Sequence, residues 1–77
     1  MARRRPRRPP TPPAGVPPVP VDLLDSAVSA ETYKAACRRY GLRRQARYWM
    51  NRTDKDAAEL AALRRRAIEA DWYRLHT

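Results

Sequence analysis

The sequence predicts an all-α protein, with a small three-helix body over residues 22–77 that follows a disordered arm over residues 1–21. All eight prolines lie within residues 1–20, where the proline ring removes backbone donors and blocks helices. The rest of the chain has no proline and shows apolar side chains at helical spacing. It also lacks the alternating β-branched runs that are typical of strands.

The predicted arm combines proline with positive charge. It contains no acidic residue and five arginines, which are Arg3, Arg4, Arg5, Arg7 and Arg8. A segment with so few apolar groups cannot offset the entropy lost on ordering, so we expect an extended, polyproline-II-like chain. The arm also matches the pattern Arg-x-x-Pro-x-x-Pro twice, from Arg3 and from Arg7, which is typical of ligands for polyproline-reading domains.

Capping residues predict the first helices of the body. Asp22 can cap a short helix that runs through Val28. Ser29 is the expected N-cap of a longer helix that ends at Tyr40. Gly41 follows directly, and glycine is the residue that most readily adopts the left-handed conformation at the end of a helix.

A further helix is expected over residues 42–51, with three apolar side chains on its inner face: Leu42, Ala46 and Trp49. Together with the preceding helix, this segment resembles a helix-turn-helix. That motif needs a small residue early, a glycine at the turn and an apolar residue after it. Ala36, Gly41 and Leu42 suit those positions. Arg47 stands where the motif usually has an apolar residue, so the resemblance is incomplete.

The C-terminal helix is expected over residues 54–75, opened by a capping box of Thr53 and Asp56. Its apolar stripe consists of Ala57, Leu60, Ala61, Ile68, Trp72 and Leu75, with Leu63 and Ala67 on the flank. Arg64 falls inside this stripe. We expect its stem to pack while its head reaches solvent or pairs with Asp71, unless the stripe is a protein interface, where arginine is enriched.

Motifs for catalysis are missing from the sequence. There is no glycine-rich phosphate loop, no paired-histidine metal motif and no Ser/His/Asp set. One cysteine and one histidine cannot form an internal disulfide or a four-ligand zinc site. Cys37 is expected in the core, and His76 at a frayed terminus. We therefore expect no enzyme, no cofactor, no metal and no small-molecule substrate.

The sequence also bears on location. No apolar run approaches the roughly 18 residues of a membrane span, and no apolar segment of a secretory signal follows the charged N-terminus. We expect an intracellular protein, located in the nucleus for a eukaryotic or viral source and in the cytoplasm or nucleoid for a bacterial one.

Charge gives the main indication of function. The net charge is +9, from 17 basic and 8 acidic side chains, and the arm contributes five of these charges. The stretch RRQARYWMNR over residues 43–52 is also rich in arginine. Arginine binds phosphate, glutamine and asparagine can read bases, and aromatic rings stack on them. The simplest alternative for this stretch is a solvated helix face with no ligand.

These features predict a non-enzymatic nucleic-acid-binding accessory or regulatory protein, acting on DNA or RNA, such as a DNA-binding regulator or a viral or phage accessory protein. The arm arginines would assist, and the expected contacts in the body are Arg43, Arg44, Arg47 and Arg52 for phosphates and Gln45 and Asn51 for bases. The alternative is an adaptor or assembly protein. Its arm would bind an acidic surface or a polyproline-reading domain, and a protein partner or a second copy would dock on Leu60, Leu63, Arg64, Ile68, Trp72 and Leu75.

Overall fold

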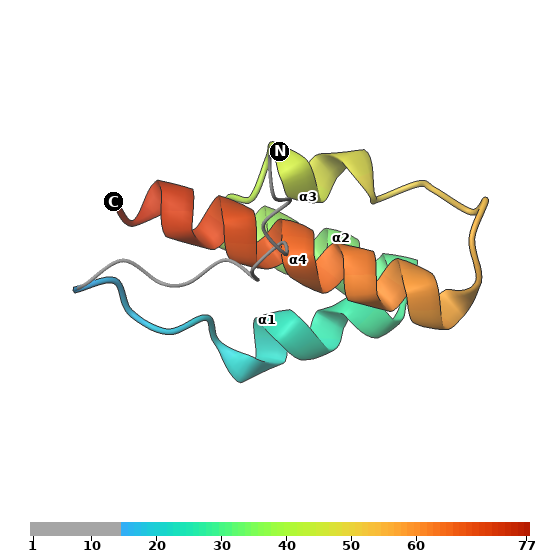
Figure 1. The fold of residues 1–77 in the computed structure, drawn as a ribbon, viewed down its shortest axis with the longest axis horizontal. Coiled ribbons are helices and arrows are strands. Elements are labelled where there is room, and N and C mark those ends of the chain that lie inside the picture. The colour runs from blue at the N-terminus through green and yellow to red at the C-terminus, as the bar shows by residue number, and fades with distance from the viewer. Residues whose placement is uncertain (1–14) are drawn as a thin grey trace, which may run out of the picture.

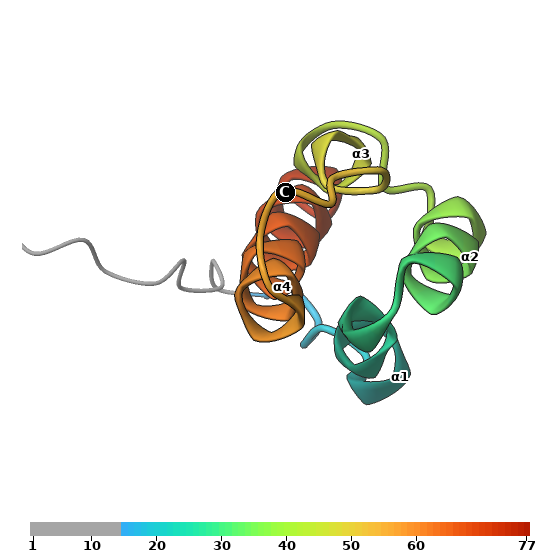
Figure 2. The ribbon, with the colours of Figure 1, turned by 90° about the vertical axis from the view of Figure 1, so that its right-hand side faces the viewer.

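The computed structural model describes residues 15–77, which are mostly helical and contain no strand (Figure 1). The predicted all-α class is confirmed. The elements in chain order are α1 (Val21–Asp25), the 3-10 helix η1 (Ser26–Val28), α2 (Ala30–Tyr40), α3 (Gln45–Tyr48) and α4 (Ala57–Leu75). Successive segments alternate in direction along the long axis. Viewed end-on, they surround a shared core, with α2 and α4 on opposite sides (Figure 2).

Helix α2 begins and ends where the sequence predicts. The Ser29 hydroxyl accepts a hydrogen bond from the Thr32 N–H at 3.3 Å, which caps the first turn. Gly41 closes the helix in the left-handed conformation, with φ of 74°. The chain then reverses because the Leu42 N–H donates to the Cys37 carbonyl at 2.9 Å. Both caps depend on neighbouring residues only.

The predicted cap of α1 is wrong. The helix starts at Val21, one residue before Asp22, and its N-cap is Pro20 with no side-chain hydrogen bond. The Pro20 carbonyl accepts from the N–H groups of Leu23 and Leu24, so the first turn is closed by backbone alone. The Asp22 carboxylate instead accepts a hydrogen bond from the Tyr40 hydroxyl, with a distance of 3.1 Å to Oδ2.

Helix α4 starts three residues later than predicted, at Ala57. Its N-cap is Asp56, whose carboxylate accepts from the Glu59 N–H at 2.8 Å. Residues 53–56 stay outside the helix, and in this segment the Asp54 carboxylate pairs with the Arg52 guanidinium at 2.7 Å. The predicted capping box of Thr53 and Asp56 is therefore replaced by a cap one turn further along.

Helix α3 is a single turn of four residues, much shorter than the predicted helix over residues 42–51. Its N-terminal N–H groups bind a carboxylate from a distant part of the chain. Asp71 Oδ2 accepts from Arg44 at 3.1 Å and from Ala46 at 2.9 Å, and Oδ1 accepts from Gln45 at 3.0 Å. The chain bends to reach this anchor on α4. One turn is too short for the second helix of a helix-turn-helix.

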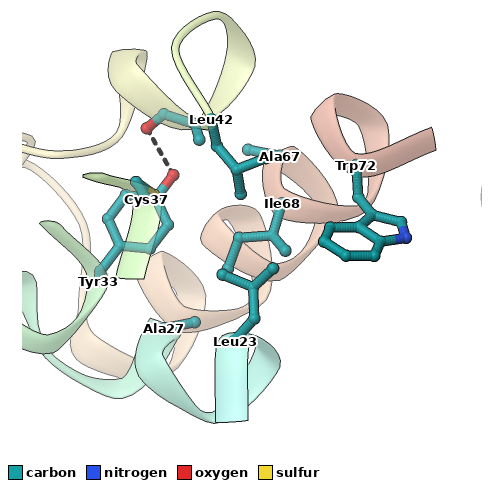
Figure 3. Close-up of a cluster of buried hydrophobic side chains, with 9 residues drawn as sticks. Leu23, Ala27, Tyr33, Cys37, Leu42, Ala67, Ile68 and Trp72 are labelled. Atoms are coloured by element: carbon teal, nitrogen blue, oxygen red, sulfur yellow. Dashed lines mark hydrogen bonds between the residues drawn. The ribbon is translucent and has the colours of Figure 1, made fainter. Parts of the chain in front are cut away.

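The core is formed by side chains from every helix, namely Leu23, Ala27, Tyr33, Cys37, Leu42, Ala46, Ala67, Ile68 and Trp72 (Figure 3). The Tyr33 side chain crosses this core, and its hydroxyl donates to the Ala46 carbonyl at 2.5 Å. This bond ties α2 to α3 and satisfies a phenol that has no exposed surface. The burial of Cys37 follows the prediction.

Arg64 does not pair with Asp71, and its head bonds to backbone within the body instead of extending into solvent. The side chain is buried, and its guanidinium donates to the carbonyls of Ala27 and Trp49, each at 3.3 Å. It also lies 5.4 Å from the centre of the Tyr33 ring. Arg64 thus satisfies a carbonyl of η1 and the carbonyl at the C-cap of α3. Asp71 instead accepts hydrogen bonds from backbone donors.

The residues before α1 lie against the body, and we call residues 16–20 the strap. The Trp72 indole N–H donates to the Pro17 carbonyl at 2.9 Å, and Val16 and Val19 pack on the core. His76, which was expected to be frayed, stacks on Trp72 with 4.0 Å between ring centroids. Residues 1–14, with the five arm arginines, lie outside the described part of the chain.

Candidate functional site

A basic groove runs between α2 and the segment that follows it. Its volume is about 530 Å³, and its lining consists of Lys34, Cys37, Arg38, Leu42, Arg43, Arg47, Met50 and Asn51. Lys34 and Arg38 lie one turn apart on α2, and Arg43 and Arg47 are four residues apart on the facing segment. Apolar side chains and Cys37 contribute the remaining wall. Four cations therefore line one hollow from two sides.

No carboxylate lines this groove. Within residues 15–77 the ion pairs are Arg52 with Asp54 and Lys55 with Glu59, and neither involves a groove cation. Four like charges around one hollow repel each other, and an anion bound between them relieves that repulsion. The groove is suited to a phosphate or another polyanion.

The structure places five of the six contact residues predicted in the body in two separate hollows, and the sixth, Arg52, in an ion pair. Arg43, Arg47 and Asn51 line the basic groove. Arg44 and Gln45 lie on the other side of α3, in a second hollow of about 590 Å³, which is also lined by Tyr48, Ala70, Asp71 and Arg74. Helix α3 thus forms a ridge between two hollows. The predicted residues do not share one helix face, because the helix that would have aligned them is a single turn.

Arg52, a predicted phosphate contact, is occupied within the chain. Its Nε and Nη2 donate to the two Asp54 carboxylate oxygens at 2.9 and 2.7 Å. These bonds raise the pKa of Arg52 above its usual value and lower that of Asp54 to about 2. The guanidinium also donates to the Tyr48 hydroxyl and lies 4.8 Å from the centre of its ring. Arg52 therefore holds Tyr48 in place.

Lys34 and Arg38 are groove residues that were not predicted from the sequence. Both project from α2 towards Arg43 and Arg47. Their spacing of four residues places them on one helix face, and this spacing is the sequence feature from which the pair could have been predicted. Their relation to the later arginines depends on how α2 packs against the next segment, which no local pattern specifies.

Three backbone N–H groups at the start of α3 are already bonded within the chain. The N–H groups of Arg44, Gln45 and Ala46 all donate to Asp71, whose side chain has no exposed surface. These three N–H groups are therefore not open to an anion.

The stripe predicted as a protein interface is mostly the chain's own core. Leu60, Arg64, Ile68 and Trp72 are all buried, with at most 8% of any of them exposed. Leu63 is half-buried, and Leu75 is 46% exposed. The face is covered by α1, η1, α3 and the strap, so most of its area is not open to a partner.

Cys37 borders the groove, and its thiol is held in the protonated form by burial. Burial raises the pKa of its thiol from 9.0 to about 11, and the thiolate is the reactive form. Within residues 15–77 no three His, Cys, Asp or Glu side chains cluster in a way that could hold a metal ion. In the same part of the chain, no helix has the length and apolar character needed to cross a membrane.

Comparison of the chain with protein-family models, with curated proteins and with solved structures finds no match.

Proposed function

We propose that this protein binds nucleic acid without catalysing a reaction, and that the basic groove between α2 and residues 43–51 holds the phosphate backbone. The observation that carries this proposal is the set of four cations, Lys34, Arg38, Arg43 and Arg47, around one hollow with no acidic residue in its lining. Phosphate contacts dominate the affinity of nucleic-acid-binding proteins. The arm arginines would add a second cationic segment to the same ligand.

The proposal is tested by fluorescence anisotropy of the full chain with labelled single-stranded and duplex oligonucleotides. The variant Arg43→Gln/Arg47→Gln should bind both probes more weakly. On a duplex, its plot of log affinity against log salt should be shallower by about 0.9 for each phosphate that the variant no longer binds.

Arg65→Gln/Arg66→Gln is the matched control. It removes the same charge from exposed positions on α4 that border none of the hollows described above. Lys34→Gln/Arg38→Gln should resemble the Arg43/Arg47 variant, although its residues lie on another helix. Equal reductions in affinity for all three double variants would refute a specific groove, and no binding of either probe by the wild type at about 50 mM salt would refute nucleic-acid binding.

A further inference from the structure

Helix α3 lies between the two basic hollows and presents one exposed aromatic side chain, Tyr48. The side chain is 60% exposed, whereas the neighbouring Trp49 is partly buried against the core. Tyr48 lines the second hollow with Arg44, Gln45 and Arg74. The only acid in that lining is Asp71, whose carboxylate is buried and bonded to backbone N–H groups.

The Tyr48 ring is fixed from within the chain. Trp49 contacts it edge to face, with 4.9 Å between ring centroids and an interplanar angle of 84°. Arg52 bonds to its hydroxyl and lies over the ring, and Arg52 is itself held by Asp54. An exposed aromatic ring costs free energy in water, and this one is supported by an ion pair and a second ring. Arg52 and Trp49 cover part of the ring, and the residue remains 60% exposed. A stacking ligand would use that exposed part, which is already positioned.

We infer that Tyr48 is a stacking platform for an unpaired base, and that the preferred ligand of the proposed interface is therefore a single strand. This inference rests on the proposed function. Reading a duplex through its major groove requires a helix or a two-stranded ribbon that enters the groove and reaches base edges. Residues 15–77 contain no strand, and α3 has one turn whose first N–H groups are already bound. In a single strand the bases are free to stack on aromatic rings while cations contact the backbone.

The two hollows divide these tasks across the α3 ridge. The groove cations Arg43 and Arg47 lie on one side, and Tyr48, with Arg44 and Gln45, lies on the other. A strand that crosses the ridge would place phosphates in the groove and a base on the ring. The Gln45 amide, at the same hollow, can then bond to a base edge.

The test compares Tyr48→Ala, Tyr48→Leu and Tyr48→Phe, using a labelled 20-nucleotide single strand of mixed sequence and the corresponding duplex. Replacing a stacking aromatic by alanine weakens single-strand binding by about tenfold or more, and we expect this for both the Ala and Leu variants. Tyr48→Phe loses the hydroxyl that Arg52 bonds but keeps the ring and its contacts with Trp49 and the Arg52 guanidinium, so it should bind within about twofold of the wild type. Duplex binding should change by less than about twofold in all three, because paired bases cannot reach the ring.

Val28→Ala is the control, since it trims a side chain that is 62% exposed on η1, outside both hollows. Circular dichroism checks that each variant keeps its helices. The inference is overturned if the wild type binds single strands but Tyr48→Ala binds them equally well, or if both probes lose affinity equally. Failure of the wild type to bind any probe would instead refute the proposed function, and the inference with it.

Discussion

At the scale of single residues, Asp71 joins α4 to the start of α3. It is a carboxylate with no exposed surface, and it accepts three backbone hydrogen bonds from residues more than 20 positions earlier in the chain. Charged acceptors give the stronger class of hydrogen bond. Without the Asp71 carboxylate, three partly buried N–H groups at the start of α3 would have no hydrogen-bond partner. Asp71 therefore holds in position the segment that lines both hollows.

We expect Asp71→Ala to lower the free energy of unfolding by about 3 kcal/mol or more, since a buried charged acceptor is removed and its donors are left unpaired. Asp71→Asn keeps one acceptor oxygen and should cost about 2 kcal/mol. Urea unfolding followed by circular dichroism measures both. Glu69→Ala, on the same helix, is the control and should stay within about 0.5 kcal/mol of the wild type. An Asp71→Ala midpoint as high as that of the control would contradict the anchoring role.

At the scale of helices and strap, local signals predicted more than long-range ones. Ser29 and Gly41 bound α2 as expected, because their hydrogen bonds join residues only three to five positions apart. The length of α3 depends on Asp71, and the position of Arg64 depends on carbonyls 15 and 37 residues away. Apolar spacing correctly placed Leu42, Ala46, Ile68 and Trp72 in the core. Apolar spacing could not show which elements would cover the apolar stripe of α4.

The strap shows the same dependence on distant partners, and its contribution can be measured. Trp72→Phe keeps an aromatic ring but removes the indole N–H that binds the Pro17 carbonyl, which should cost about 1 kcal/mol for the bond alone. Val19→Ala should cost a similar amount in the wild type, because Val19 packs on the core.

Urea unfolding of the two single variants and the double variant tests whether these contacts act together. If Trp72 holds the strap in place, Val19→Ala should cost clearly less in the Trp72→Phe background than in the wild type. Costs that simply add would show that the strap packs independently of the indole.

At the scale of the whole molecule, the net positive charge can be counted from the sequence, but the positions of the charges in space cannot. The part of the chain after the predicted arm carries 12 basic and 8 acidic side chains, and several acids are used internally. Asp71 binds backbone, Asp54 binds Arg52, and Asp56 caps α4. Lys34, Arg38, Arg43 and Arg47 gather at one groove only because α2 and the next segment face each other. Composition could predict an anionic partner, whereas the groove required the fold.

The buried core also sets how stability should depend on pH. Burial raises the pKa of Cys37 from 9.0 to about 11 and raises that of Tyr33 well above its usual 10.0. The folded protein therefore keeps protons that the unfolded chain has released above about pH 9, so stability should be fully present below pH 9 and fall as the pH rises. The Cys37 share amounts to about 2 kcal/mol by pH 11.

Urea unfolding at pH 7, 9, 10 and 11, with a reductant present, measures this decline. The Cys37→Ala variant has no thiol to ionise, so its stability should begin to fall about one pH unit higher, where Tyr33 ionises in the unfolded chain. Tyr40 adds to this fall, because its hydrogen bond to Asp22 also raises its pKa. A stability that stays constant from pH 9 to 11 would mean that the thiol and the phenol ionise as readily in the folded protein as in the unfolded chain. That result would contradict a closed core in which both groups have no exposed surface.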